Sequence, residues 1–102
     1  MILTENTKYL RKLAKKIRAV SFNVKVDTFM EEIKYYKPCI AWIIVKRINN
    51  VFECYVTIAD KIDNTYRFDS EMDLIDFLQD LYETVFYSNE ANVIDNEIIA
   101  IV

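Results

Sequence analysis

The sequence predicts a single α+β domain over residues 1–102, with helices packed as a second layer on an antiparallel sheet of three to five strands. Two runs rich in β-branched and aromatic residues, 39–48 and 51–59, flank Asn49-Asn50, which predicts a central hairpin. Apolar residues recur at helical spacing on both sides of these runs, and 53% of the residues are hydrophobic, which is ample for a packed core. The three expected helices span about residues 4–19, 28–36 and 71–87.

The first expected helix, 4–19, has an apolar side and a basic side. At 100° per residue the apolar side chains gather on one face, and the basic side chains lie opposite or beside it. We expect the apolar face to pack on the sheet. The apolar face comprises Leu3, Leu10, Leu13, Ile17 and Val20. The basic set comprises Lys8, Arg11, Lys12, Lys15, Lys16 and Arg18.

The stretch between this helix and Pro38 is expected to hold a short edge strand and a second helix. Residues 21–26 alternate apolar and polar side chains, as an edge strand does. Residues 28–31 fit a helix capping box, so a helix is predicted over 28–36. Its apolar stripe would comprise Phe29, Ile33 and Tyr36.

The central hairpin has a defined register. Asn tolerates the left-handed conformation that a two-residue turn requires, so the turn is placed at Asn49-Asn50. Lys46 then faces Glu53, and these opposite charges favour the pairing slightly. The other facing pairs are Ile48 with Val51, Ile44 with Tyr55 and Trp42 with Thr57.

The C-terminal part is predicted to add a strand and a helix. Residues 65–68 read as a third short strand, and Ser70 opens a helix over about 71–87. The Ile and Val content of 97–102 favours a last strand, with a helix over 91–102 as the alternative.

The composition excludes several kinds of chemistry. The chain has no Gly, so it has no phosphate-cradling loop of the P-loop or dinucleotide type. It has no His, so it has no Ser-His or Cys-His pair and no His metal ligand. We therefore expect no catalytic residues, no metal and no cofactor, and a protein that is not an enzyme.

The cysteines and the apolar runs bear on the cell compartment. Cys39 and Cys54 are too far apart along the predicted hairpin for a disulfide, and both are expected to be buried, inert thiols. The longest apolar run, 39–45, is much shorter than the roughly 20 residues that span a bilayer. We expect no membrane association and a cytoplasmic location.

Charge is divided unevenly along the chain. Residues 1–20 carry six basic side chains and one Glu, whereas residues 60–102 carry two basic side chains and eleven carboxylates. Four of these carboxylates fall on one face of the last predicted helix, about 4.5–6 Å apart along its axis. This spacing resembles a row of phosphates, although a solvated face is the simpler alternative. The acidic row comprises Asp73, Asp76, Asp80 and Glu83, with Asp69 and Glu71 nearby.

Two further surfaces are candidates for binding. The hairpin carries Trp42, Ile44 and Tyr55 on the face opposite its expected core face, so either helices cover both faces of the sheet or this face is an interface. The basic helix could bind nucleic acid, but the whole chain is acidic.

Residues 40–86 resemble small phage-encoded anti-CRISPR proteins, which inhibit Cas nucleases. The resemblance runs from 43–50 through Glu53-Cys54-Tyr55-Val56 to Ser70-Glu71 and the acidic helix. In some of these families a helix, a three-stranded antiparallel sheet and acidic helices make up an acidic protein that lacks catalytic residues and blocks a DNA-binding surface. The resemblance implies a similar role for this chain.

The leading hypothesis is therefore a small non-enzymatic protein of a phage or mobile element, acting in the cytoplasm of the host cell. It would bind and inhibit a host protein or nucleoprotein complex through the acidic row. One alternative is a homodimeric structural or scaffold protein that uses the face of Trp42, Ile44 and Tyr55. The other, direct binding of nucleic acid by the basic helix, is disfavoured.

Overall fold

The computed structural model describes residues 3–59 and 62–88. The strand expected over 97–102, like the alternative helix over 91–102, lies outside the described residues. Within the described part, no helix is both long enough and apolar enough to cross a membrane.

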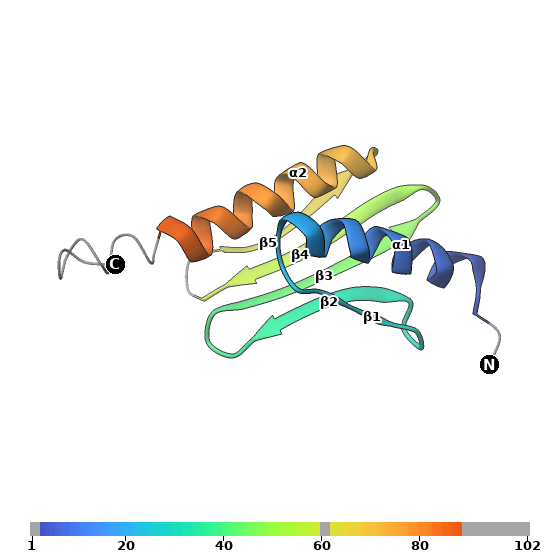
Figure 1. The fold of residues 1–102 in the computed structure, drawn as a ribbon, viewed down its shortest axis with the longest axis horizontal. Coiled ribbons are helices and arrows are strands. Elements are labelled where there is room, and N and C mark those ends of the chain that lie inside the picture. The colour runs from blue at the N-terminus through green and yellow to red at the C-terminus, as the bar shows by residue number, and fades with distance from the viewer. Residues whose placement is uncertain (1–2, 60–61, 89–102) are drawn as a thin grey trace, which may run out of the picture.

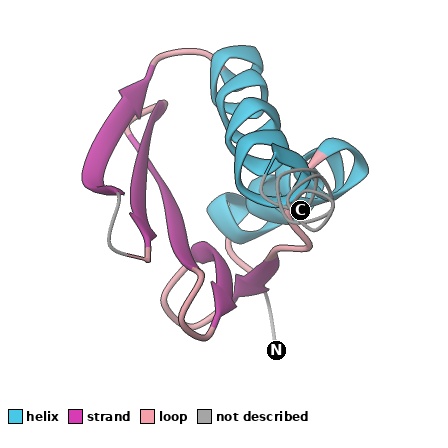
Figure 2. Cartoon of the chain, turned by 90° about the vertical axis from the view of Figure 1, so that its left-hand side faces the viewer, coloured by secondary structure: helices cyan, strands magenta, loops and turns pink. Residues whose placement is uncertain are grey.

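Two α-helices cover one side of a five-stranded antiparallel sheet (Figures 1 and 2). The strands lie in the sheet in the same order as in the sequence, and each pairs with the next. The α+β class and the antiparallel sheet are thus confirmed. The elements are α1 (Glu5–Val20), β1 (Lys25–Asp27), β2 (Glu32–Lys37), β3 (Ala41–Ile48), β4 (Val51–Ile58), β5 (Ile62–Phe68), α2 (Glu71–Tyr82) and the π-helical turn η1 (Glu83–Ser88).

The central hairpin of β3 and β4 has the predicted register. Lys46 faces Glu53, and the other three predicted pairs are also present. Asn49 and Asn50 have φ values of 51° and 64°, so both lie in the left-handed region that a two-residue hairpin turn needs. The predicted third strand is also confirmed, but it begins earlier, at Ile62.

The predicted helix over 28–36 is wrong, because the chain forms a second hairpin there. The carboxylate of Asp27 accepts hydrogen bonds from the backbone N–H groups of Phe29 and Met30, at 3.0 and 2.9 Å, and Glu31 turns the chain with a φ of 55°. β2 then follows with the two-residue period of a strand. Ile33 is fully buried, whereas Phe29, which the helix would have buried, is 91% exposed.

The segment before this hairpin is only partly a strand. Within the predicted strand 21–26, only residues 25 and 26 pair with β2, where they begin the three-residue strand β1. Phe22 and Val24 are fully buried without belonging to the sheet, so they fix the chain between α1 and β1 in the core.

Both other helices start where the sequence predicts. The hydroxyls of Thr4 and Ser70 cap α1 and α2, accepting hydrogen bonds from the backbone N–H groups of Thr7 and Asp73 at 3.0 Å each. The predicted helix over 71–87 is α-helical only as far as Tyr82, after which η1 continues it as a π-turn.

The core lies between the helices and the inner face of the sheet. Leu10, Leu13 and Ile17 of α1 are buried there as predicted, whereas Val20 is partly exposed. Phe22 is the largest fully buried side chain, and its ring contacts three other aromatic rings. The hairpin contributes Ala41, Ile43, Val45, Phe52, Cys54, Val56 and Ile58, and α2 contributes Leu74, Leu78 and Leu81.

Candidate binding surfaces

None of the described helices lies on the outer face of the sheet. Both described α-helices lie on the other side, so helices do not cover both faces of the sheet in the described part of the chain (Figure 2). Trp42 is 51% exposed and Tyr36 is 65% exposed on this side, and Tyr55 and Ile44 lie between them and the charged residues described below. We call this side the open face; on β2–β5 it comprises Glu32, Lys34, Tyr36, Trp42, Ile44, Lys46, Ile48, Val51, Glu53, Tyr55, Thr57, Asp63, Thr65 and Arg67.

Aromatic side chains gather at one end of the open face. The rings of Tyr36 and Trp42, on paired positions of β2 and β3, meet edge to face with centroids 5.8 Å apart. A shallow hollow of about 160 Å³ lies beside them and is bordered also by Cys39 and Thr57. This end therefore has apolar surface and a hollow that a side chain of a partner can fill.

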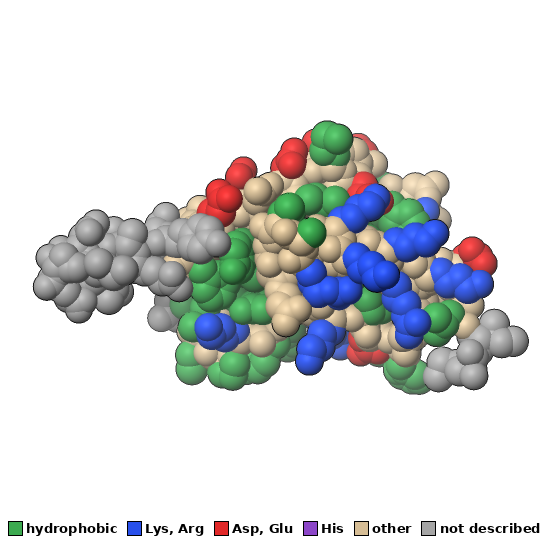
Figure 3. Space-filling model, viewed as in Figure 1, with side chains coloured by type: hydrophobic (Ala, Val, Ile, Leu, Met, Phe, Trp, Pro, Cys, Tyr) green, Lys and Arg blue, Asp and Glu red, His purple; other side chains and the backbone are tan. Residues whose placement is uncertain are grey.

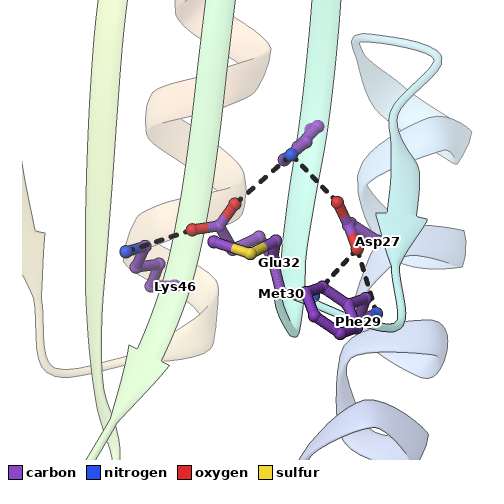
Figure 4. A network of polar contacts seen from close by, with 6 residues as sticks. Asp27, Phe29, Met30, Glu32 and Lys46 are labelled. Carbon is purple, nitrogen blue, oxygen red and sulfur yellow. Dashed lines mark hydrogen bonds and ion pairs between the residues drawn. The ribbon is translucent and has the colours of Figure 1, made fainter.

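Charged side chains form a row across the other end of the open face (Figure 4). Lys34 lies between Asp27 and Glu32, with N–O distances of 3.0 and 3.6 Å, and Lys46 contacts the other oxygen of Glu32 at 3.0 Å. The side chain of Glu32 is only 5% exposed, so this carboxylate is held between the two lysines. On the next strands the row continues with Glu53 and Arg67, 3.9 Å apart.

These contacts hold the charges of the row in place. The hydrogen bond to Glu32 raises the pKa of Lys46, and the hydrogen bond to Asp27 raises the pKa of Lys34. The backbone N–H of Met30, followed by Lys34, lowers the pKa of Asp27. The hydroxyl of Tyr55 donates to Glu53 at 2.9 Å, which raises the pKa of the tyrosine. The shifts for Asp27, Lys34 and Lys46 therefore all favour the charged form of these side chains.

The acidic row on α2 faces solvent. Asp73, Asp76, Asp80 and Glu83 are all exposed, and no ion pair to them is found among the described residues. Asp69 is exposed too. Carboxylates lie along the upper edge of the molecule over α2 in Figure 3. Glu83 lies in η1, so the α-helical spacing predicted for the row holds only over its first three members.

Glu71 does not belong to the acidic row, although the sequence grouped it there. Its carboxylate accepts hydrogen bonds from Nζ of Lys16, at 2.5 Å, and from the hydroxyl of Tyr9. Both partners lie on α1, so Glu71 joins the two helices. Its negative charge is therefore matched within the chain.

Glu71→Gln is expected to make folding stability less dependent on pH in the acid range. The bonds from Lys16 and then Tyr9 lower the pKa of Glu71 below its ordinary value of 4.5. A carboxyl group whose pKa is lower in the folded chain adds stability above its unfolded pKa, and loses it as pH falls through the folded value. Urea unfolding at a series of pH values should show a steeper loss below pH 4.5 for wild type than for the variant.

A suitable control for this measurement is Glu5→Gln, because the side chain of Glu5 is 93% exposed and its Lys8 contact is 3.5 Å long. Its pH dependence should match that of wild type. Equal slopes for Glu71→Gln and wild type would show that the contact between the helices adds no stability.

The basic side of α1 is less free than the sequence suggests. Lys16 contacts Glu71, and Arg18 donates to the backbone oxygen of Val24 at 2.9 Å. Arg47 of β3 also contacts α1, with its guanidinium 4.0 Å from the centre of the Tyr9 ring. In Figure 3 the basic side chains cover the surface over α1, next to the acidic edge formed by α2.

The two cysteines differ in environment, and both are free. Cys54 is buried as predicted, and burial raises the pKa of its thiol to about 12, so the thiol stays protonated and unreactive at neutral pH. The prediction is wrong for Cys39, which is exposed in the turn between β2 and β3. The turn bends the chain there with a φ of 64° at Cys39, and this holds the side chain away from the core.

Several residues of the open face were missed by the sequence analysis. Glu32, Lys34 and Tyr36 were assigned to a helix, although the alternation of polar and apolar residues from Glu32 to Tyr35 is the two-residue period of a strand. Reading this alternation would have extended the face of Trp42, Ile44 and Tyr55 by one strand.

Among residues 3–59 and 62–88, no group of three Cys, Asp or Glu side chains is placed to hold a metal ion. No family model matches the chain, and no significant match is found among curated proteins or among solved structures.

Proposed function

We propose that this chain is a non-enzymatic binding protein, and that its recognition surface is the open face of the sheet. The observation that carries this proposal is the exposure of Trp42 and Tyr36 on a sheet face that none of the described helices covers. Trp and Tyr are enriched among the residues that dominate binding energy at protein interfaces. Side chains fixed by ion pairs lose less conformational freedom on binding, which favours recognition by a preformed surface.

The charge of the open face favours a protein partner over a nucleic acid. From β2 to β5 it carries three basic side chains and three acidic ones, so it has no net charge. A nucleic-acid surface draws much of its affinity from an excess of Lys and Arg that contact phosphates. The six side chains are Lys34, Lys46, Arg67, Glu32, Glu53 and Asp63.

A second candidate function uses the acidic row of α2. Asp73, Asp76 and Asp80 are exposed at helical spacing, and no described Lys or Arg forms an ion pair with them, so they are available to Lys or Arg groups of a partner. In this mode the protein, encoded by a phage or mobile element, inhibits a host protein or nucleoprotein complex by occupying a surface that normally holds phosphates. Such binding weakens steeply as salt concentration rises.

One capture experiment tests both candidates. A tagged copy is expressed in the native host beside the untagged chain, and retained proteins, the untagged chain included, are quantified by mass spectrometry. The sheet variant is Tyr36→Ala with Trp42→Ala, and the helix variant is Asp73→Asn, Asp76→Asn and Asp80→Asn. All of these side chains are exposed, so both variants should fold, and each serves as the control for the other.

We expect at least one partner to be recovered about tenfold less with the sheet variant and undiminished with the helix variant. Loss with the helix variant alone would support the acidic row instead. Recovery of every partner at wild-type levels with the sheet variant would overturn the proposal for the open face.

A further inference from the structure

We infer that the partner on the open face is a second copy of this chain, packed face to face about a two-fold axis that runs parallel to the strands between β3 and β4. The inference rests on the proposed function, since it names the occupant of the same surface. It comes from the order of charges across the sheet, which makes the open face complementary to itself in this one arrangement.

The charged row alternates in sign from strand to strand. Glu32 lies on β2, Lys46 on β3, Glu53 on β4 and Arg67 on β5, and the ion pairs and the strand register place them side by side in that order. A two-fold axis that runs along the strands, midway between β3 and β4, reverses the order of the strands in the second copy. It leaves the position of the charged row along the strand direction unchanged, so the two rows lie opposite each other.

This reversal sets each of these four charges opposite one of the other sign. β3 faces β4 of the second copy, so Lys46 lies opposite the second copy's Glu53. β2 faces β5, so Glu32, whose side chain is 5% exposed between Lys34 and Lys46, lies opposite the second copy's Arg67. The symmetry forms each pair twice. Packed sheets lie about 10 Å apart and cross at about 30°, a gap that opposed Lys, Arg and Glu side chains can bridge between them.

The apolar positions are brought together by the same axis. Two residues along each strand from the Lys46–Glu53 pair, Ile44 lies opposite the second copy's Tyr55, and beyond it Trp42 lies opposite Thr57 and Tyr36 lies opposite Asp63. The arrangement thereby covers Ile44, Tyr55 and Trp42. A two-fold axis at right angles to the strands would instead set the charged row against the end that carries Trp42, which leaves charges facing apolar side chains.

The size of the face sets the expected affinity. Four strands at about 4.8 Å spacing and seven residues at about 3.3 Å rise give a flat area of about 440 Å² per copy. A standard interface buries about 800 Å² per partner, so the dimer is expected to be weak, with a dissociation constant of about 1–100 µM.

Trp42 provides a direct test, because it is the chain's single Trp and lies on the open face. The purified protein is examined from about 0.5 to 500 µM, a range that brackets this affinity, by sedimentation velocity and by tryptophan emission. We expect the mass to double and the emission to shift to the blue over the same concentration range. A monomer at the highest concentration, or association that leaves the emission unchanged, would overturn the inference.

A charge exchange tests the register. In Glu53→Lys, a Lys faces the second copy's Lys46, and in Lys46→Glu, a Glu faces the second copy's Glu53. Each variant alone should raise the dissociation constant at least about tenfold. An equimolar mixture restores both pairs of opposite charge and should dimerise as wild type does. Circular dichroism and thermal melting of the diluted variants verify their folds.

Asp76→Lys is the matched control, since it makes the same change of charge on α2, away from the open face. It should dimerise as wild type does. A dimer in which the basic α1 of one copy docks on the acidic α2 of the other gives the opposite result. If Lys46→Glu fails to fold because Glu32 then faces an acid, the comparison of Glu53→Lys with Asp76→Lys decides alone, and equal dissociation constants overturn the inference.

Failure of this inference is distinct from failure of the proposed function. If the isolated protein stays monomeric but captures another partner through Trp42 and Tyr36, the open face is still its recognition surface. The inference that a second copy occupies this face is then wrong. If capture does not depend on these residues, both the proposed function of the open face and the inferred dimer are wrong.

Discussion

Phe22→Ala should lower the free energy of unfolding by about 3–5 kcal/mol, the largest effect expected of any single truncation here. Phe22 is fully buried, and its ring lies 4.9 Å from that of Tyr35, 5.2 Å from that of Tyr82 and 5.9 Å from that of Phe86, measured between centroids. These contacts join β2 to α2 and η1. The truncation removes the buried apolar surface of the ring and leaves a cavity. Because β2, α2 and η1 surround this cavity and are each held by other contacts, they cannot move far enough to close it.

The control is Phe29→Ala, which makes the same chemical change at a side chain that is 91% exposed. It should alter the free energy of unfolding by no more than about 0.5 kcal/mol. Both are measured by denaturant unfolding, with Phe22→Leu as a milder variant should the alanine variant be unfolded. Similar losses at positions 22 and 29 would contradict the core as described, and would favour the helix over 28–36 that buries Phe29.

Glu32→Ala is expected to cost about 2 kcal/mol of folding stability. Glu32 is the one buried charged residue among those described. Its carboxylate oxygens form two ion pairs, at 3.0 Å from Nζ of Lys46 and 3.6 Å from Nζ of Lys34. Its removal leaves two lysines next to each other without a shared carboxylate. The cost stays below that of breaking a fully buried pair, because both lysine side chains are more than a third exposed and become hydrated.

Glu53→Ala is the comparison for this measurement, since Glu53 lies in the same row but pairs with Arg67 at 3.9 Å, and the side chain of Arg67 is 67% exposed. It should cost less than about 1 kcal/mol. Equal costs for the two substitutions would show that the burial of Glu32 adds nothing to the effect of its ion pairs, and a gain in stability from Glu32→Ala would show that these ion pairs do not stabilise the fold.

The elements that the sequence predicts correctly are those whose signals are local. In the central hairpin, the turn at Asn49-Asn50 and the alternation of each strand fix which residues face each other, and the observed register is the predicted one. For α1, the helical spacing of Leu10, Leu13 and Ile17 is enough to identify the buried face. Neither result requires knowledge of the rest of the chain.

The error at 28–36 arises because one local pattern serves two structures. A side-chain oxygen that accepts hydrogen bonds from N–H groups two and three residues ahead can begin a helix or close a turn, and Asp27 does the latter. The choice depends on the edge of β3, where β2 pairs from Lys37 back to Ile33 and buries Ile33. That edge belongs to the tertiary structure.

For the candidate surfaces too, the sequence predicts the local features and the tertiary structure decides the rest. The sequence by itself determined which side chains share a face: Trp42, Ile44 and Tyr55 through the two-residue period of a strand, and Asp73, Asp76 and Asp80 through the turn of a helix. Only the tertiary structure decided which faces stay exposed. Both helices pack on the same side of the sheet, and Glu71 contacts Lys16 and Tyr9, which precede it in the sequence by 55 and 62 positions. Packing between distant segments leaves no periodic signal in the sequence, because it depends on the summed burial of the whole core.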